Sequence, residues 1–289
     1  MKRLLLTSAV VASLVGAGGS AALAAPPTPI WSWTGFYVGA NVGYSWGRSN
    51  SGIDFRDAAS GALLSSAGVD SDLRGVIGGG QFGYNWQHND WLFGFEADIQ
   101  GSAQKGSATG SCAGGSLATP PASLFGACAP GHIGDTTPFN VAALPVVDTL
   151  DQSLDWFGTV RGRIGPTITP TIVGYVTGGL AYGQVSTTNT VSGTNLIGPQ
   201  GVNGVTIVPV GASATNTTIQ VGWTLGAGIE GALRDNWTCK IEYLHVDLGH
   251  VTGSFVTPII APSGAFVTSS YSSHITDDIL RVGVNYKLP

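Results

Sequence analysis

Charged residues are scarce in this sequence, and many of them alternate with apolar residues and share a face with glycines and small polar residues. Only 10% of the residues are charged. In the stretch 91–100, Glu96 and Asp98 fall on the same side of an extended chain as Gly94, while apolar residues take the other side. Glycines and small polar residues likewise surround Arg161, Arg163, Glu230, Lys240, Glu242 and Arg281, and Asp155 and Lys287 are assigned to the same face. Acids and bases that face one enclosed space predict ion pairing, because a buried charge is tolerable only when it is paired and hydrogen-bonded.

Histidines, acids and serines form a second set in the C-terminal part of the chain. Its members are His245, Asp247, His250 and His274, with Ser272 or Ser273. A lipid-modifying enzyme, a metal site or a haem-iron site would use such side chains. Their spacing matches no catalytic motif, so the sequence predicts a protein that is not an enzyme, with no catalytic residue, cofactor or metal site.

The N-terminus has the form of an export signal. Lys2 and Arg3 precede an apolar stretch at 4–15, and Ala22-Leu23-Ala24 is a small-residue cleavage site. The stretch is shorter than the ~20 residues that a spanning helix needs. Residues 1–24 are therefore predicted to be a cleaved signal peptide, and 25–33 a periplasmic lead-in to a barrel at 34–289.

Export places the three cysteines in an oxidising compartment. Cys112 and Cys128 fall in one predicted loop, so they are expected to form a disulfide, with Cys239 left over. Without Lys2 and Arg3, the balance of 12 Lys+Arg against 17 Asp+Glu becomes 10 against 17, a charge of about −7. That charge offers no basic stripe for phosphates, so no nucleic-acid partner is expected.

The elements that must position the charges are predicted to be membrane-spanning strands. Low charge and 44 glycines do not suit an ordinary soluble surface, and no apolar run after the signal reaches helix-spanning length. A membrane accepts only helices or closed barrels, because every backbone polar group needs a partner there. Eight stretches alternate with period two, at roughly 34–47, 73–88, 90–103, 153–165, 171–186, 218–233, 236–250 and 275–288.

The predicted connections alternate in length, which is typical of outer-membrane barrels. Tight turns are expected at 88–90, 166–170 and 234–236, and long polar loops at 48–72, 104–152, 187–217 and 251–274. A soluble sandwich or lipocalin-like barrel would instead hide its apolar face and expose its charges. Only Arg74, Asp247 and Asp278 fall on the apolar face, each at a loop end, which favours an all-β, eight-stranded antiparallel transmembrane barrel.

The interior of such a barrel is just wide enough for side chains to fill. The expected neighbours are Glu96 with Arg161 and Arg163, Glu230 with Lys240, and Glu242 with Arg281. Glu96, Asp98, Arg161, Arg163, Glu230, Lys240, Glu242 and Arg281 are therefore predicted to plug the lumen with ion pairs. The alternative is that water hydrates these charges and they line a conduction path.

Four segments resemble the porin-like outer-membrane immunogenic proteins of alphaproteobacteria, which are OmpA-like eight-stranded barrels. They are WTGFYVGANVGY (33–44), YVTGGLAYG (175–183), KIEYLHVDLG (240–249) and RVGVNYK (281–287), similar to that family's first, fifth, seventh and closing strands. The family usually ends on an aromatic residue that the barrel-insertion machinery reads, whereas this chain ends Lys287-Leu288-Pro289 after Tyr286.

The resemblance implies a barrel in the cell outer membrane with a structural, adhesive or antigenic surface role. The expected partners are outer-membrane lipid and lipopolysaccharide, the insertion machinery, and a host or surface ligand at the external loops. One alternative is a narrow porin for passive diffusion of small solutes. A second is a haem-binding or lipid-modifying site at the rim.

Overall fold

The computed structural model describes residues 31–57, 61, 63–112, 146–197, 206–258 and 266–289. All of them belong to one compact unit, Trp31–Pro289. The predicted signal peptide, most of the predicted lead-in, and Cys128 lie outside the described residues. Within the described part of the chain, no helix is long and apolar enough to cross a membrane.

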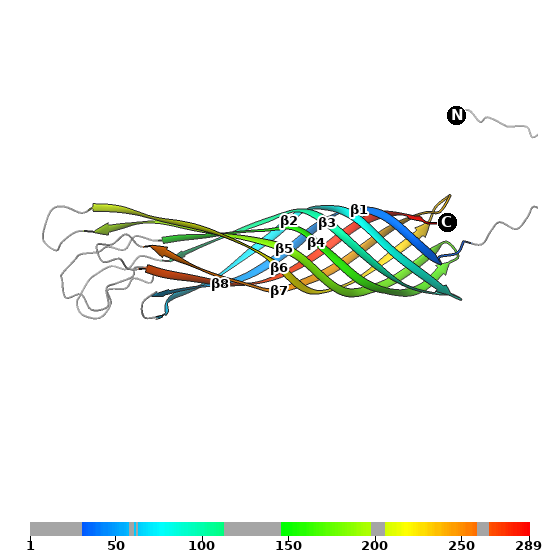
Figure 1. Ribbon diagram of the computed structural model, residues 1–289, viewed down its shortest axis with the longest axis horizontal. Coiled ribbons are helices and arrows are strands. Elements are labelled where there is room, and N and C mark those ends of the chain that lie inside the picture. The colour runs from blue at the N-terminus through cyan, green and yellow to red at the C-terminus, as the bar shows by residue number, and fades with distance from the viewer. Residues whose placement is uncertain (1–30, 58–60, 62, 113–145, 198–205, 259–265) are drawn as a thin grey trace, which may run out of the picture. The chain divides into compact units, whose positions relative to one another are not determined.

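Eight long strands form a closed antiparallel barrel, which confirms the predicted fold (Figure 1). They are β1 (Gly35–Asp57), β2 (Leu63–His88), β3 (Trp91–Cys112), β4 (Val146–Thr169), β5 (Ile172–Ile197), β6 (Thr206–Ala232), β7 (Trp237–Pro258) and β8 (Phe266–Lys287). Each strand pairs with its neighbours in sequence, and β1 pairs with β8 from Tyr37↔Lys287 to Asp57↔Val267. Closure pairs the strands on both sides near the short turns, as a lipid environment requires, whereas residues 206–222 of β6 have no ladder partner in β7.

The turns at one end are short, as predicted. Asn89 and the pair Asp235-Asn236 adopt positive φ angles of 53°, 55° and 69°, which Asn and Asp tolerate better than other non-glycine residues. The turn between β4 and β5 is shorter than predicted, because β4 continues to Thr169 and Pro166 pairs with Trp91 of β3. We call the end of the barrel that carries these turns the turn side and the opposite end the loop side.

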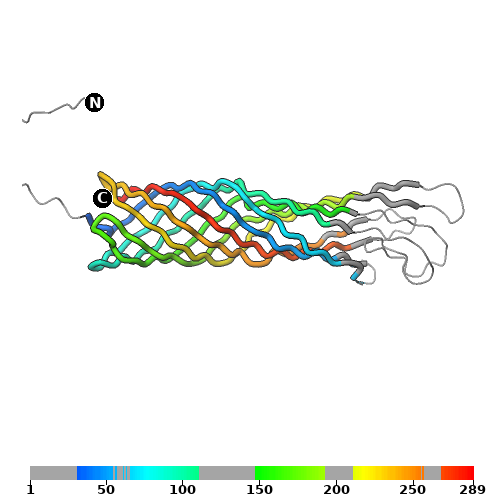
Figure 2. Tube along the Cα trace, turned by 180° about the vertical axis from the view of Figure 1, so that it is seen from behind, coloured from blue at the N-terminus to red at the C-terminus, as the bar shows by residue number. Residues whose placement is uncertain are grey.

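The described residues of the predicted long loops are almost all strand, so on this point the sequence-based boundaries were wrong; 113–145 of the second loop lie outside the described residues. β1 continues to Asp57 and β5 to Ile197, with unbroken antiparallel partners on both sides over most of that length (Figure 2). We call this part of the barrel the loop-side extension: residues 47–57, 63–75, 102–112, 146–155, 183–197, 206–218, 246–258 and 266–279. Its outward residues are mostly polar, so the parts beyond the predicted strands looked like loops even though alternate positions such as Ile53 and Val191 are buried.

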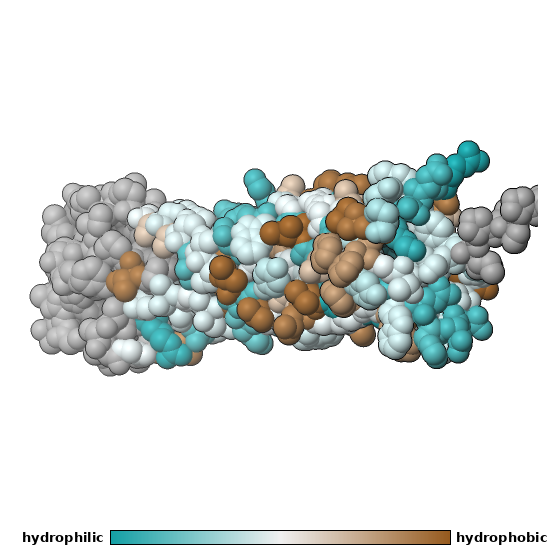
Figure 3. All heavy atoms as spheres, turned by 45° about the vertical axis from the view of Figure 1, so that its right-hand side comes forward, coloured by the Kyte–Doolittle hydropathy of each residue, from teal (hydrophilic) through white to brown (hydrophobic). Residues whose placement is uncertain are grey.

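The outer wall of the turn-side half is apolar. Outward residues such as Val42, Ile99 and Leu225 are 57%, 58% and 58% exposed. Figure 3 shows these hydrophobic residues gathered over the turn-side half of the wall, while the described wall of the extension is mostly pale or hydrophilic. We call this band the apolar belt; an outward-facing apolar band is the lipid-facing surface of a spanning barrel.

A β-bulge corrects one predicted orientation. The β4–β5 register shifts between Leu154 and Trp156, which turns the intervening Asp155 outward instead of onto the lumen face. There its carboxylate accepts hydrogen bonds from Ser153 Oγ at 2.9 Å and Ser186 Oγ at 3.0 Å. Bulges bend and twist a strand locally, and they are common where sheets close into barrels.

Candidate functional site: the barrel interior

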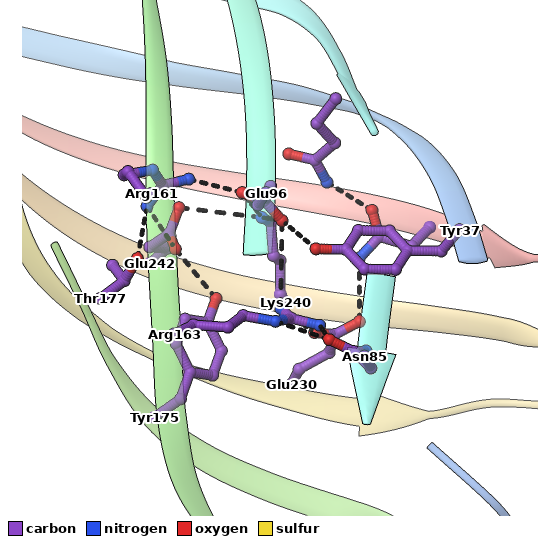
Figure 4. Close-up of polar contacts among 12 residues, drawn as sticks. Tyr37, Asn85, Glu96, Arg161, Arg163, Tyr175, Thr177, Glu230, Lys240 and Glu242 are labelled. Atoms are coloured by element: carbon purple, nitrogen blue, oxygen red, sulfur yellow. Dashed lines mark hydrogen bonds and ion pairs between the residues drawn. The ribbon is translucent and has the colours of Figure 1, made fainter. Parts of the chain in front are cut away.

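The eight predicted lumen residues are all buried and lie close together. Figure 4 labels six of them: Glu96, Arg161, Arg163, Glu230, Lys240 and Glu242. Each is at most 5% exposed. The strands position them by alternation, since every second side chain of β3, β4, β6, β7 and β8 faces inward at this level. Four cations thus share one enclosed space with four carboxylates: Arg161, Arg163, Lys240 and Arg281 with Glu96, Asp98, Glu230 and Glu242.

Glu96 is the most connected member of this network. Lys240 Nζ lies 2.8 Å from both of its carboxylate oxygens, and Arg161 forms a further ion pair with Oε1. Arg163 and Arg281 approach the same carboxylate at 3.9 Å and 3.4 Å. The hydroxyl of Tyr37 donates a hydrogen bond of 2.8 Å to Oε2.

Arg281 and Arg161 bridge the other two carboxylates at this level. Arg281 Nη2 lies 2.6 Å from Glu242 and 2.9 Å from Asp98. Arg161 contacts the same two carboxylates, each at 3.0 Å. Removing any one of these side chains would therefore leave an opposite charge buried without its full complement of partners.

Arg163 forms the turn-side end of the network. Its guanidinium pairs with Glu230 at 2.9 Å and donates to the side-chain oxygen of Asn85. The rings of Tyr37 and Tyr175 flank the guanidinium, with centroids 4.9 Å and 5.1 Å from Cζ, which adds cation–π attraction.

The predicted pairing was right for two of the three sets and wrong for the third. Glu96 meets Arg161 and Arg163, and Glu242 meets Arg281, as expected. Glu230 pairs with Arg163 instead of Lys240, although Glu230 and Lys240 are opposite each other in the β6–β7 register. The long lysine side chain crosses the lumen to Glu96, where it neutralises the most crowded carboxylate.

Two tyrosines that the sequence reasoning placed but did not use are part of the network. Tyr37 donates to Glu96, and Tyr175 donates to Glu242 at 3.0 Å. Their hydroxyls lie where a Cβ of Gly83 or Gly228 would be, so both positions require glycine. The available signal was an aromatic residue on an otherwise small inward face, matched by a glycine on a neighbouring strand.

Aromatic and apolar residues close the turn-side mouth. Trp33 is 2% exposed and packs with Leu92, Val173 and Tyr175. Trp31 contacts Trp33 edge to face at a centroid distance of 5.8 Å, and Lys287 Nζ lies 5.7 Å from the ring centroid of Trp31. The cavity that remains beside them has a volume of about 10 Å³, room for one water molecule at most.

An apolar core fills the barrel on the loop side of the ion network. It begins with Ile279 and Leu244, two positions beyond Arg281 and Glu242 on their strands, and continues to Ile53 and Leu150. Its members are Ile53, Ile77, Leu150, Leu154, Phe157, Ala181, Val185, Leu244, Val246, Leu248, Val251, Tyr271, Ile275 and Ile279. The interior is thus occupied by side chains at three successive levels.

Comparisons with known proteins assign this architecture. Residues 11–287 match the family model described as an outer membrane protein beta-barrel domain. The chain belongs to this family.

Outer-membrane relatives match most of the length of this outer-membrane barrel. The 31 kDa outer-membrane immunogenic protein of Brucella melitensis is 35% identical over 285 residues, covering 97% of this chain and 94% of the relative. A 22 kDa outer membrane protein of Rhizobium leguminosarum bv. viciae is 27% identical, covering 77% and 68%. Ail, the attachment invasion locus protein of Yersinia pestis, aligns with a TM-score of 0.28 at 10% identity, over 85% of this chain and 98% of that chain.

The histidine set of this outer-membrane barrel lies on its outer wall, in two separate histidine–aspartate pairs. His245 Nδ1 is 2.8 Å from Asp278, His274 Nε2 is 3.1 Å from Asp247, and the rings of His250 and His274 stack at 4.7 Å. Ser273 faces the interior, where it bonds Ser51 at 2.6 Å. In the described segments, no three His, Cys, Asp or Glu side chains converge on a metal position.

The structure describes the side chain of Cys239 but not those of the two cysteines of the predicted disulfide. Cys112 is the last residue of β3, and its predicted disulfide partner Cys128 lies outside the described segments, so the disulfide stays a prediction. Cys239 of β7 is half-buried and has a free thiol.

Proposed function

We propose that this outer-membrane protein is a closed barrel with a structural and surface role, not a channel and not an enzyme. The observation that carries the proposal is the filled interior, with aromatic, ion-paired and apolar levels stacked along one axis. A conducting lumen needs a continuous water path, and buried, mutually paired charges do not provide one. The eight ion-paired residues act as the plug.

The surface role is assigned to the loop side. The name of the Brucella relative describes it as an immunogenic protein, and an antigen must be accessible from outside the cell. We infer that this protein displays its external segments in the same way, as antigen or adhesive surface toward a host or surface ligand. Lipopolysaccharide would surround its outer wall, and the barrel-insertion machinery would assemble it.

The test is single-channel recording on protein extracted from outer membranes, with a heat-modifiable shift on a gel to verify the folded barrel. Closed plugs predict no conductance steps from the wild-type protein. Arg281→Ala should create a leak or lower the unfolding temperature, because Glu242 and Asp98 lose a partner. Stable ohmic steps from verified wild-type barrels would support the narrow porin instead.

A matched control is Arg56→Ala, because Arg56 pairs with Asp54 at 3.1 Å on the exposed surface of β1. An exposed ion pair contributes at most about 1 kcal/mol to the free energy of unfolding, so this variant should fold normally and show no conductance steps. The rim alternative has its own test: His245→Ala and His274→Ala should leave any lipid-modifying activity or haem retention of the cells unchanged if the rim is ordinary surface.

A further inference from the structure

The wall of the loop-side extension loses its backbone ladder along two lines. The β6–β7 ladder ends at Trp223↔Asp247, so 206–222 of β6 have no ladder partner in β7, and the β2–β3 ladder ends at Arg74↔Lys105. We call these lines the β6–β7 gap and the β2–β3 gap. Among the described residues, the extension therefore consists of two four-stranded sheets, β3–β4–β5–β6 and β7–β8–β1–β2, with the apolar core between them. The loop-side ends of β5 and β6 lie apart from those of β7 and β8 (Figure 1).

A bulge in β7 directs this strand away from β6. The β7–β8 register shifts between Asp247 and Gly249, where the ladder with β6 has just ended. Gly249 has a φ of 72°, a conformation that favours glycine, and its N–H donates to the carboxylate of Asp247 at 2.8 Å. Bulges bend a strand and terminate pairing, so the local sequence builds the β6–β7 gap into the wall.

The inner face of β6 is uncovered beside this gap. On the neighbouring strand β5, the inward side chains of Asn189 and Val191 are at most 4% exposed. Their register partners on β6, Ala214 and Ala212, also point inward but are half-exposed. A strand with an unpaired backbone edge and an uncovered face of small side chains is a surface that another strand can pair with and cover.

The two gaps differ in charge and in width. Asp70 and Asp72 lie on the unpaired part of β2, and charged side chains are one of the features that keep sheet edges from pairing with other chains. The strands also stay close there, since a Cβ on Gly106 of β3 would lie 2.7 Å from the carbonyl oxygen of Asp72. At the β6–β7 gap, none of residues 206–222 and 248–258 is Asp, Glu, Lys or Arg. Only the β6–β7 gap therefore presents edges that lack charged side chains.

We propose that the unpaired edges of β6 and β7 bind those of a second copy of this chain in the same membrane. A two-fold axis along the membrane normal places β6 of each copy beside β7 of the other. β6 and β7 run in opposite directions, so this pairing is antiparallel, as is the ladder that joins the two strands within one chain near the turns. Each four-stranded sheet of one copy then continues into a sheet of the other.

A second copy suits this gap better than a single strand from another polypeptide. One strand inserted between β6 and β7 would be antiparallel to one edge and parallel to the other, because the two edges run in opposite directions. The symmetric dimer pairs both edges of both copies without a parallel ladder, and it brings uncharged edges against uncharged edges. The edges at the β2–β3 gap lie at the outside of this dimer, where their charges end the assembly at two copies. The pairing is independent of whether the lumen is closed.

Native mass spectrometry of protein extracted from outer membranes in mild detergent tests the proposal. The wild-type protein should appear as two copies. Ala214→Lys places a charge on the uncovered inner face of β6 and should convert the protein to one copy, while the heat-modifiable gel shift verifies a folded barrel. Ala67→Lys is the matched control, because Ala67 is also a half-exposed inward alanine but lies on β2 at the other gap. This control should remain at two copies.

Cross-linking identifies the edges that pair. Continued past the bulge, the Trp223↔Asp247 register brings Thr217 opposite Ser254, and both are exposed. Chains carrying Thr217→Cys and chains carrying Ser254→Cys are co-expressed, each with the three native cysteines replaced by serine, so the two thiols lie on different copies. A short bifunctional thiol reagent should join these chains, and it should not join Thr217→Cys to Ser66→Cys of β2.

Three results would overturn the proposal. The first is wild-type protein that is extracted as one copy. The second is a two-copy species that persists in Ala214→Lys or that lacks the cross-link between β6 and β7. The third is a bound polypeptide of another sequence in place of the second copy, which would make the same edges a docking site for a different protein.

Discussion

The turn-side half and the loop-side extension use the same eight strands with opposite surfaces. In the turn-side half, apolar side chains face out and charges face in. In the extension, polar side chains face out, and the interior holds an apolar core together with buried polar residues such as Gln152 and Asp277. The alternation of the strands does not change across the border. What changes is the medium outside the wall, from lipid to water. The alternation of inward and outward side chains determines the fold, while the medium on each side determines which residue types face outward.

The two interiors are therefore stabilised by different forces. In the extension, burial of apolar side chains away from water stabilises the barrel as it does in a soluble protein. In the turn-side half, the interior depends on a network in which each charge requires its partners. Substitutions in the two regions should therefore differ in how much they lower the free energy of unfolding and in how many neighbouring strands they destabilise.

The largest effect is expected from breaking the ion network. Arg163→Met should lower the free energy of unfolding in lipid vesicles by about 3–5 kcal/mol, because Glu230 is left buried without its cation. Adding Glu230→Gln should recover part of that loss, since the uncompensated charge disappears. Urea unfolding monitored by the gel shift measures both. A double variant that costs the sum of two single variants would refute the network.

A cavity in the extension should cost slightly less and stay local. Leu150 is 1% exposed, and Leu150→Ala should lower the stability of the extension by about 2–5 kcal/mol. Hydrogen exchange should accelerate in the extension part of β4 and its neighbours, while the amides of the belt keep their protection. Equal acceleration in the belt would mean that the two regions unfold as one unit.

Removing one neutral donor from the network should have a smaller effect. Tyr37→Phe deletes the hydroxyl that donates to Glu96 while keeping the ring against Arg163. A hydrogen bond to a charged group is worth about 1.5–3 kcal/mol, which sets the expected loss in the same urea assay. Tyr84→Phe is the matched control, because the hydroxyl of Tyr84 has no hydrogen-bond partner among the described residues.

The smallest effect concerns pH and is confined to the extension. Burial raises the pKa of Asp148 from 3.8 to about 6, although the amide of Asn189 donates to its carboxylate. The folded carboxyl holds its proton more tightly than the unfolded one. The extension should therefore gain stability as the pH falls through about 6, and the gain should be complete below 3.8.

Asp148→Asn should reduce this pH dependence without abolishing it, because burial also raises the pKa of Asp277, in the extension part of β8, to about 6. Hydrogen exchange of the extension, corrected for the intrinsic effect of pH on exchange, gives the readout between roughly pH 7.5 and pH 4, a range that contains most of the expected change. Exchange that keeps the wild-type pH dependence in the variant would assign the effect to another group.

The sequence predicted the fold and the lumen residues because both depend on alternation alone. Strict period two placed Glu96, Arg161 and Arg281 on one face without any knowledge of their partners. The partners of Glu230 and Lys240 were not predictable in the same way, because a flexible lysine can reach several carboxylates across a closed lumen. Register gives neighbours along the wall but not contacts across the interior.

The extension was missed for a physical reason. Segments such as 186–191 carry Ser, Thr and Asn on both faces, which is typical of loops as well as of a water-exposed barrel wall. Their strand character comes from pairing with equally polar neighbours and from isolated buried residues such as Val185 and Val191. Asp155 was misplaced because a one-residue bulge reverses the alternation.

The loop-side extension also determines how far the external ends of the strands lie from the membrane. Eleven residues of β1 continue past Trp46, a strand length of roughly 35 Å. The barrel wall therefore projects beyond the lipid, and the loop-side ends of the strands lie outside the membrane. The length of the extension can change in steps of two residues per strand, because inserting or deleting two residues keeps every inward side chain inward. Under immune or adhesive selection, the loop-side extension can thus become longer or shorter by mutation while the turn-side half, which spans the bilayer, stays unchanged.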